Sequence, residues 1–171
     1  MKAIDRASDF LGVVGAALLL ATGAFLTYEV VARYVFTAPT KWAQELSELS
    51  LLWGVFIALG RIVHRRENIA IDVVYERFGT ARRRLIDGFA LALTLGILVF
   101  IARYGYALAW ESIERGTTTG TMLNYPSWWE ELAVPVGCTW AAVQAVLELY
   151  RVVTGRGETP RGIDADMARH A

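Results

Sequence analysis

The sequence predicts an all-α membrane protein with four transmembrane helices and a short amphipathic surface helix between the second and third spans. Hydrophobic residues make up 55% of its 171 residues, and its mean hydropathy is +0.37, which is too apolar for an ordinary soluble domain of this size. Four apolar runs are each long enough to cross a bilayer, and arginines cluster between the second and third. These observations predict one helical domain, residues 1–153, followed by a flexible cytoplasmic tail, residues 154–171.

The first two predicted spans cover residues 10–31 and 45–63. Lys2 and Arg6 precede the first apolar run, as in a signal peptide, but the run is longer than a signal core, which favours an uncleaved span. Pro39 separates the two spans. The second span begins with a polar face and then becomes fully apolar.

The last two predicted spans cover residues 85–103 and 128–150. Ser127 and Glu130 have the spacing of a capping box at the start of the last span. Pro135 removes one backbone hydrogen bond, so we expect a kink near that end. The surface helix is expected at residues 69–78, because Ile71, Val74 and Phe78 fall on one helical face after Asn68.

The positions of the basic residues predict the orientation. Seven arginines lie between residues 61 and 84, and placing this connection and both termini inside collects 13 of the 17 basic residues. Four basic residues then lie outside: Arg33, Lys41, Arg103 and Arg115. We therefore expect a multi-pass membrane protein with both termini in the cytoplasm.

Two carboxylates in the second span are candidates for contacts with a partner protein. A charge at the centre of a span costs about 2.5–3.5 kcal/mol, and much less near the interface. Glu45 and Glu48 lie close to the outer interface, so they are either solvated from outside or face a partner helix that carries hydrogen-bond donors. The full set of partner-interface candidates is Trp42, Glu45, Glu48, Trp53 and Pro135.

Two further sets of charged residues are candidates for binding. Arginines at the cytoplasmic surface could bind anionic headgroups at about 1 kcal/mol each, or could serve only as topology signals; they are Arg65, Arg66, Arg82, Arg83 and Arg84. At the outer edge, a weak repeat of A-R-Y and W-x-x-E-L between the two halves suggests hairpin ties. In this hypothesis, Arg33 approaches Glu45 or Glu48, and Arg103 approaches Glu130 or Glu131.

The residue types argue against three classes of chemistry. Haem anchors ligate iron through histidines within their spans, whereas this chain has only His64 and His170, near the ends of predicted elements. The span hydroxyls lack a histidine that could act as a base for hydrolysis. The middle of each span lacks the ionisable groups of a self-sufficient transporter. We therefore expect a non-enzymatic protein without a cofactor, bound metal or nucleic-acid partner.

Two segments together resemble a known family. The first runs from Trp42 through Trp53 to a basic turn and the apolar-Asp segment 68–72; the second is SWWEELAVPVG, with Pro135 and Gly137. Their order and spacing are similar to the small membrane subunit, DctQ-like, of tripartite ATP-independent periplasmic (TRAP) transporters. The resemblance covers most of residues 8–153. One departure is Asn68, where many members carry a histidine.

The resemblance implies a non-catalytic subunit that braces a large multi-span permease in the membrane. In such systems, a periplasmic binding protein delivers an organic acid, and an ion gradient, usually sodium, drives its import. The outer loops 37–41 and 116–127 are then candidate contacts for the binding protein. The alternative is a structural membrane anchor for a cytoplasmic or respiratory enzyme.

Overall fold

The computed structural model describes residues 2–65 and 80–154. By length and composition, four of its helical segments could each cross a bilayer, which confirms the predicted all-α, four-span fold class. The expected surface helix at 69–78, Arg66 and the tail from residue 155 lie outside the described residues.

The first three long helices extend beyond the apolar runs that predict them, and the last predicted span is divided between two helices. They are α1 (Lys2–Tyr34), α2 (Ala43–Arg65), α4 (Thr80–Arg115), α5 (Trp128–Glu131) and α6 (Ala133–Val153). With 36 residues, α4 is about 54 Å long at 1.5 Å per residue, against a hydrocarbon thickness of about 30 Å. It therefore crosses the membrane at a tilt, projects beyond it, or both.

The C-terminus of α4 shows why that helix ends where it does. Gly116 follows with a φ of 61°, which places it in the left-handed region that favours glycine. The Thr117 N–H donates to the Ser112 carbonyl (3.1 Å). This hydrogen bond gives a partner to one of the last carbonyls of α4, which have no N–H donor within the helix. The connection at 116–127 then folds back through a bridge between Thr118 and Pro126.

The last span is interrupted at Leu132, between α5 and α6. Pro135 lies three residues later and has no N–H to donate to the preceding turn, in keeping with a break at this point. The predicted capping box is wrong, because Ser127 has helical backbone angles (φ −60°, ψ −29°) and makes no side-chain cap. Glu130 is instead engaged by the Tyr125 hydroxyl.

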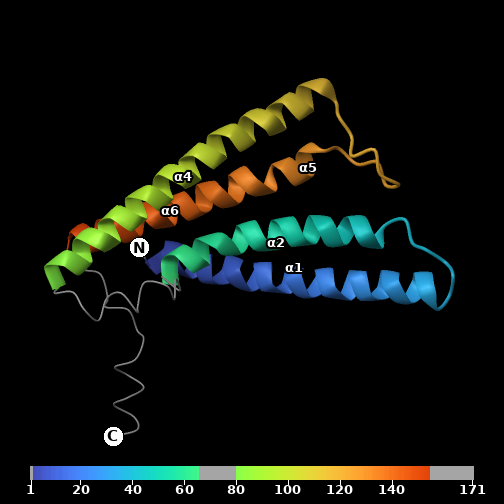
Figure 1. Ribbon diagram of the computed structural model, residues 1–171, viewed down its shortest axis with the longest axis horizontal. Helices are drawn as coiled ribbons and strands as arrows, with labels where there is room; N and C mark the ends of the chain where they lie inside the picture. Colours follow the sequence, from blue (N-terminus) through green and yellow to red (C-terminus); the bar gives the residue numbers. More distant parts are fainter. Residues whose placement is uncertain (1, 66–79, 155–171) are drawn as a thin grey trace, which may run out of the picture.

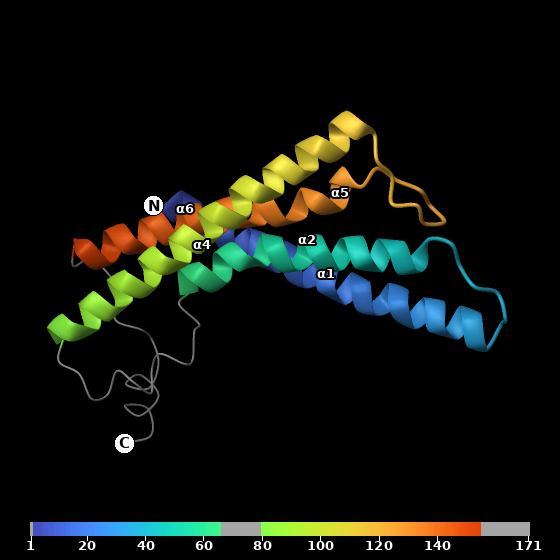
Figure 2. The same cartoon turned by 45° about the horizontal axis from the view of Figure 1, so that its top comes forward.

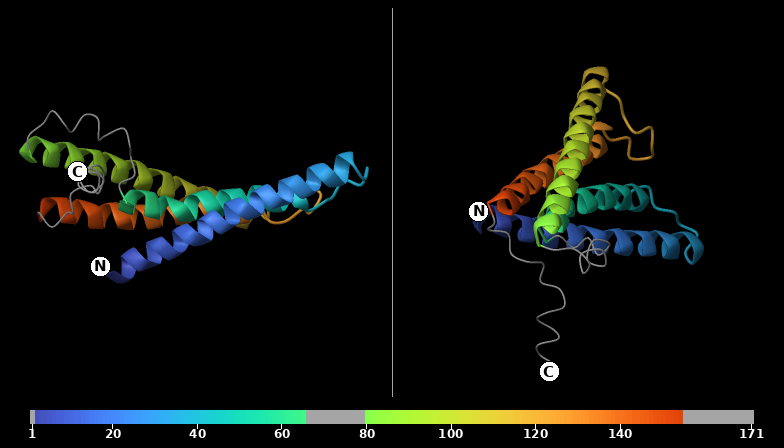
Figure 3. Two further views of the ribbon diagram at one scale, coloured as in Figure 1. Left: turned by 90° about the horizontal axis from the view of Figure 1, so that it is seen from below. Right: turned by 60° about the vertical axis from the view of Figure 1, so that its left-hand side comes forward.

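The helices form two antiparallel hairpins that meet along their inner helices. α1 packs on α2, α2 on α6, and α6 on α4, and Figures 1 and 2 show the hairpins diverging toward one end. We call this the hairpin end, because it carries the connections at 35–42 and 116–127. The opposite end, where α1 begins and α6 finishes, is the termini end. Figure 3 shows α1 crossing the other helices obliquely.

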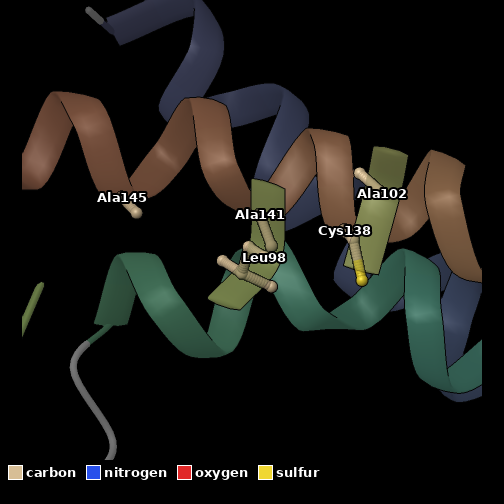
Figure 4. Packing of buried hydrophobic residues seen from close by; sticks show 5 residues of the cluster. All are labelled: Leu98, Ala102, Cys138, Ala141 and Ala145. Carbon is tan, nitrogen blue, oxygen red and sulfur yellow. The ribbon is translucent and has the colours of Figure 1, made fainter. Parts of the chain in front are cut away.

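The apolar core lies where α2, α4 and α6 meet (Figure 4). Its buried members come from α4 and α6 and are Leu98, Ala102, Cys138, Ala141 and Ala145, with Phe56 and Leu59 of α2 packed against them. Most of these side chains are small. Small residues let membrane helices approach closely. Close approach matters because the hydrophobic effect does not drive helix association within a bilayer, so van der Waals packing and polar contacts must stabilise it.

Two glycine positions show how close the helices come. A Cβ on Gly15 would lie 2.6 Å from the Gly54 carbonyl oxygen, so α1 and α2 touch backbone to backbone. A Cβ on Gly137 would lie 2.6 Å from the Phe56 carbonyl carbon, so α6 and α2 do the same. In both cases the obstacle is backbone, which cannot move aside as a side chain can.

Candidate functional site

The candidate site is the hairpin end, where carboxylates accumulate around the two connections. Glu29 near the end of α1 is 4% exposed. Its Oε1 accepts from Arg33 (2.7 Å), and its Oε2 accepts from the Thr40 N–H (3.0 Å) and from the Thr40 hydroxyl. Glu29 therefore fixes the 35–42 connection against the helix that precedes it.

Glu45 connects the two hairpins. This residue is 8% exposed, and its carboxylate accepts from the Leu123 N–H at 3.0 and 3.2 Å. Leu123 lies in the 116–127 connection, so this contact joins the start of α2 to the loop between α4 and α5. A hydrogen bond to a charged acceptor contributes about 1.5–3 kcal/mol.

The two tryptophans predicted to face a partner have contacts within the chain. Trp42 stacks on Tyr28 (centroids 5.6 Å apart) and meets Phe25 edge-on (6.0 Å), so it packs across the α1–α2 hairpin. The Trp53 indole N–H donates to the Trp129 carbonyl (3.1 Å). Pro135 is also internal, because it is buried and packs against α4 at Gly105.

Glu130 and Glu131 bind neighbours near α5. Ser112 donates its hydroxyl to Glu131 (2.7 Å), while the other carboxylate oxygen of Glu131 is buried without a hydrogen-bond partner among the described residues. Tyr125 donates its hydroxyl to Glu130. Burial, followed by the hydrogen bond to Glu130, raises the pKa of Tyr125, so this hydroxyl keeps its proton and remains a donor.

The expected outer-edge pairs differ from the contacts in the structure. Arg33 binds Glu29 one turn earlier on its own helix, because an i,i+4 pair forms without bringing two helices together. Arg103 is exposed, and among the ion pairs of the described residues it has none with Glu130 or Glu131. The hairpin end is therefore tied by carboxylates that accept from hydroxyls and backbone amides.

A groove of about 410 Å³ runs between α1 and α2 at this end. Its polar part includes Arg33, Gln44 and Glu48, and its apolar part includes Leu26 and Leu51. Glu48 is exposed, and the hydrogen bond given for its carboxylate comes from the Gln44 amide (3.2 Å). Of the five partner-interface candidates, Glu48 is thus the one whose charge is directed outward.

Sequence reasoning missed a polar network at the termini end. Arg151 of α6 donates to both Asp5 oxygens (2.7 and 2.8 Å) and to Glu148. About two helical turns before Arg151 on α6, the Gln144 amide donates to the Ser8 hydroxyl, and both residues are fully buried. The contacts between α6 and α1 join residues more than 130 positions apart, and no local spacing signals them.

The structure gives little detail for the arginines expected at the cytoplasmic surface. Arg65 ends α2, and Arg82, Arg83 and Arg84 lie in the first turns of α4, so their proposed lipid contacts stay predictions. Within residues 2–65 and 80–154, no group of three or more histidine, cysteine or acidic side chains is arranged to hold a metal ion.

Comparison with known families bears directly on this arrangement. The family model described as "Tripartite ATP-independent periplasmic transporters, DctQ component" matches residues 22–155, which include the second part of α1 and all of α2, α4, α5 and α6. The chain belongs to the DctQ family. DctQ subunits are transport machinery and not enzymes, and the four spans make this one a multi-pass membrane protein.

One curated TRAP transporter protein aligns with a large part of the chain. It is the sialic acid TRAP transporter permease protein SiaT of Haemophilus influenzae (strain 86-028NP), 23% identical over 105 residues. The alignment covers 61% of this chain and 17% of the relative. The chain therefore spans about one sixth of the length of that permease.

Proposed function

We propose that this DctQ subunit holds a large permease subunit in the inner membrane while that subunit imports an organic acid with an ion gradient, which the family resemblance indicates is a sodium gradient. A periplasmic binding protein delivers the substrate in this proposal, and both termini of the chain face the cytoplasm. The similarity to part of a sialic acid permease supports a place within a larger transport assembly.

The observation that carries this proposal is where the charges lie. The stretches 10–28, 49–60, 88–102 and 132–147 contain no Asp, Glu, Lys or Arg, whereas the described charged clusters lie at the two ends. A protein that moves an ion or an acid through itself needs polar groups near the midplane. A protein that fixes a partner needs helices that pack into one scaffold and side chains exposed on its surface, and the described helices supply both.

The sets of candidate residues have different roles in this proposal. Trp42, Glu45, Trp53 and Pro135 hold the scaffold that presents the interface, and Glu48 faces the partner. Arg65, Arg66, Arg82, Arg83 and Arg84 bind anionic headgroups on the cytoplasmic side. The 37–41 and 116–127 connections meet the binding protein.

Co-purification from native membranes tests the proposal. The tagged chain is expected to bring down a large multi-span permease in fixed ratio, and deleting the chain is expected to abolish uptake of the transported acid. Uptake should return when the chain is supplied again. Recovery of a respiratory or cytoplasmic enzyme in place of a permease would instead establish the membrane-anchor alternative.

A further inference from the structure

We propose that the groove between α1 and α2 seats a membrane segment of the large permease subunit that presents one lysine or arginine side chain to Glu48. This inference rests on the proposed function and specifies which surface of the chain makes the contact. The groove lies at the hairpin end and has a volume of about 410 Å³.

The charges in the groove define its occupant. Two carboxylates, Glu29 and Glu48, face one guanidinium, Arg33. Arg33 is already bound through its Nε and one terminal nitrogen to Glu29, and Glu29 is further bound by Thr40. What remains is the carboxylate of Glu48, which makes the groove complementary to a single positive charge.

The same charges favour a protein side chain over a phospholipid. A phospholipid headgroup carries a phosphate that would lie near Glu29 and Glu48, and it would have to compete with Glu29 for the Arg33 guanidinium. A lysine or arginine brings its positive charge without an anion. Its long aliphatic stem also suits the apolar part of the groove at Leu26, Val30 and Leu51.

The groove opens away from the second hairpin. Gly60 of α2 faces Trp140 of α6, since a Cβ on Gly60 would lie 2.7 Å from the Trp140 indole nitrogen. Leu51 precedes Gly60 by nine residues, about two and a half helical turns, so it lies on the opposite face of α2. Leu26, Val30 and Leu51 are all exposed, which leaves the groove accessible to another polypeptide.

Charge reversal tests the contact in the intact transporter. Glu48→Lys is expected to lower recovery of the large subunit with the tagged chain by about tenfold or more, because two positive charges would then meet at a poorly solvated site. Glu114→Lys, an exposed carboxylate at the same end of the molecule on α4, is the matched control and should leave recovery unchanged. Equal recovery for both variants would overturn the proposal.

Photocrosslinking tests the same surface with Glu48 in place. A photoreactive phenylalanine analogue at Leu51 is expected to yield an adduct with the large subunit in native membranes, and the same analogue at Leu108, exposed on α4, should not. Adducts with lipid alone at Leu51, or with the large subunit only from Leu108, would overturn the groove proposal. Absence of the large subunit from the wild-type preparation would overturn the proposed function itself.

Discussion

The two ends of the molecule use their charges differently. At the termini end, Arg151 binds Asp5 and Glu148, and Arg61 lies 3.7 Å from Asp9, so charges join α1 to α6 and to α2. At the hairpin end, carboxylates bind loops and hydroxyls, and Glu48 is directed outward. The termini end therefore holds the chain together, whereas the hairpin end also offers an acceptor to another molecule.

The largest expected effect is a loss of stability when the ion-pair network at the termini end is removed. Arg151→Ala removes the guanidinium that Asp5 and Glu148 bind in a largely buried site, so the free energy of unfolding should fall by about 3–5 kcal/mol. Denaturation in mixed detergent micelles, followed by helix content, measures the loss.

Arg115→Ala is the matched control for that experiment. Arg115 pairs with Glu111 on one helix, and their side chains are 70% and 51% exposed, so its removal should cost at most about 1 kcal/mol. Similar losses for the two variants would show that burial does not distinguish the ends.

The next largest effect concerns the contribution of close helix packing, between the two ends, to the stability of the protein. Gly137→Ala places a Cβ against the Phe56 backbone and should destabilise the α2–α6 contact by about 1–3 kcal/mol. Gly96→Ala is the control, because no atom lies within 4 Å of its Cβ position, and it should be neutral or stabilise α4 by about 0.5–1 kcal/mol. If Gly137→Ala behaved like Gly96→Ala, close helix approach would not hold the hairpins together.

A smaller, local effect distinguishes the roles of Glu45 and Glu48 at the hairpin end. Glu45→Ala removes the acceptor for the Leu123 N–H, so hydrogen exchange in the 116–127 connection should accelerate by an amount equivalent to about 1.5–3 kcal/mol. Glu48→Ala should leave that exchange unchanged, because Glu48 binds Gln44 and not the loop. Faster exchange in both variants would mean that the two carboxylates do not have separate roles.

The smallest effect concerns Tyr125. Tyr125→Phe removes one hydrogen bond to Glu130 and should increase loop exchange by the equivalent of about 1 kcal/mol. The raised pKa of Tyr125 means that the contribution of its hydroxyl is fully present below the ordinary tyrosine pKa of about 10 and is lost only at higher pH. Loop protection corrected for intrinsic exchange should thus be constant from about pH 6 to 9, and a decline in that range would contradict the raised pKa.

Hydropathy is sufficient to predict the four spans, because a helix that faces lipid needs a continuous run of apolar residues, and such a run can be recognised directly in the sequence. The helix ends were harder to predict. Continued backbone hydrogen bonding carries α4 through polar residues to Arg115, beyond the apolar run that ended the predicted span near residue 103. The capping box failed for a related reason, since Ser127 already has helical backbone angles and Glu130 has a nearer donor in Tyr125.

The candidate site was predictable only in part. Glu45 and Glu48 stood out because carboxylates are rare in a span, yet their different roles depend on the position of Leu123, which is 78 residues away from Glu45. The contacts of Arg151 and Gln144 with α1 depend on how the two hairpins meet. Spacing along the chain carries no information about such contacts.

The central position of α6 has a consequence for biosynthesis. Of the four described spans, α6 is the last to leave the ribosome, and it supplies the packing surface for both α2 and α4 and the ion pair to α1. The α1–α2 hairpin can associate as soon as its two spans are inserted. In contrast, α4 can make its main helix contact only after α6 has been inserted. A chain that stops before α6 would leave α4 without its main neighbour in the bilayer, so the four-span unit is completed only after α6 has been inserted.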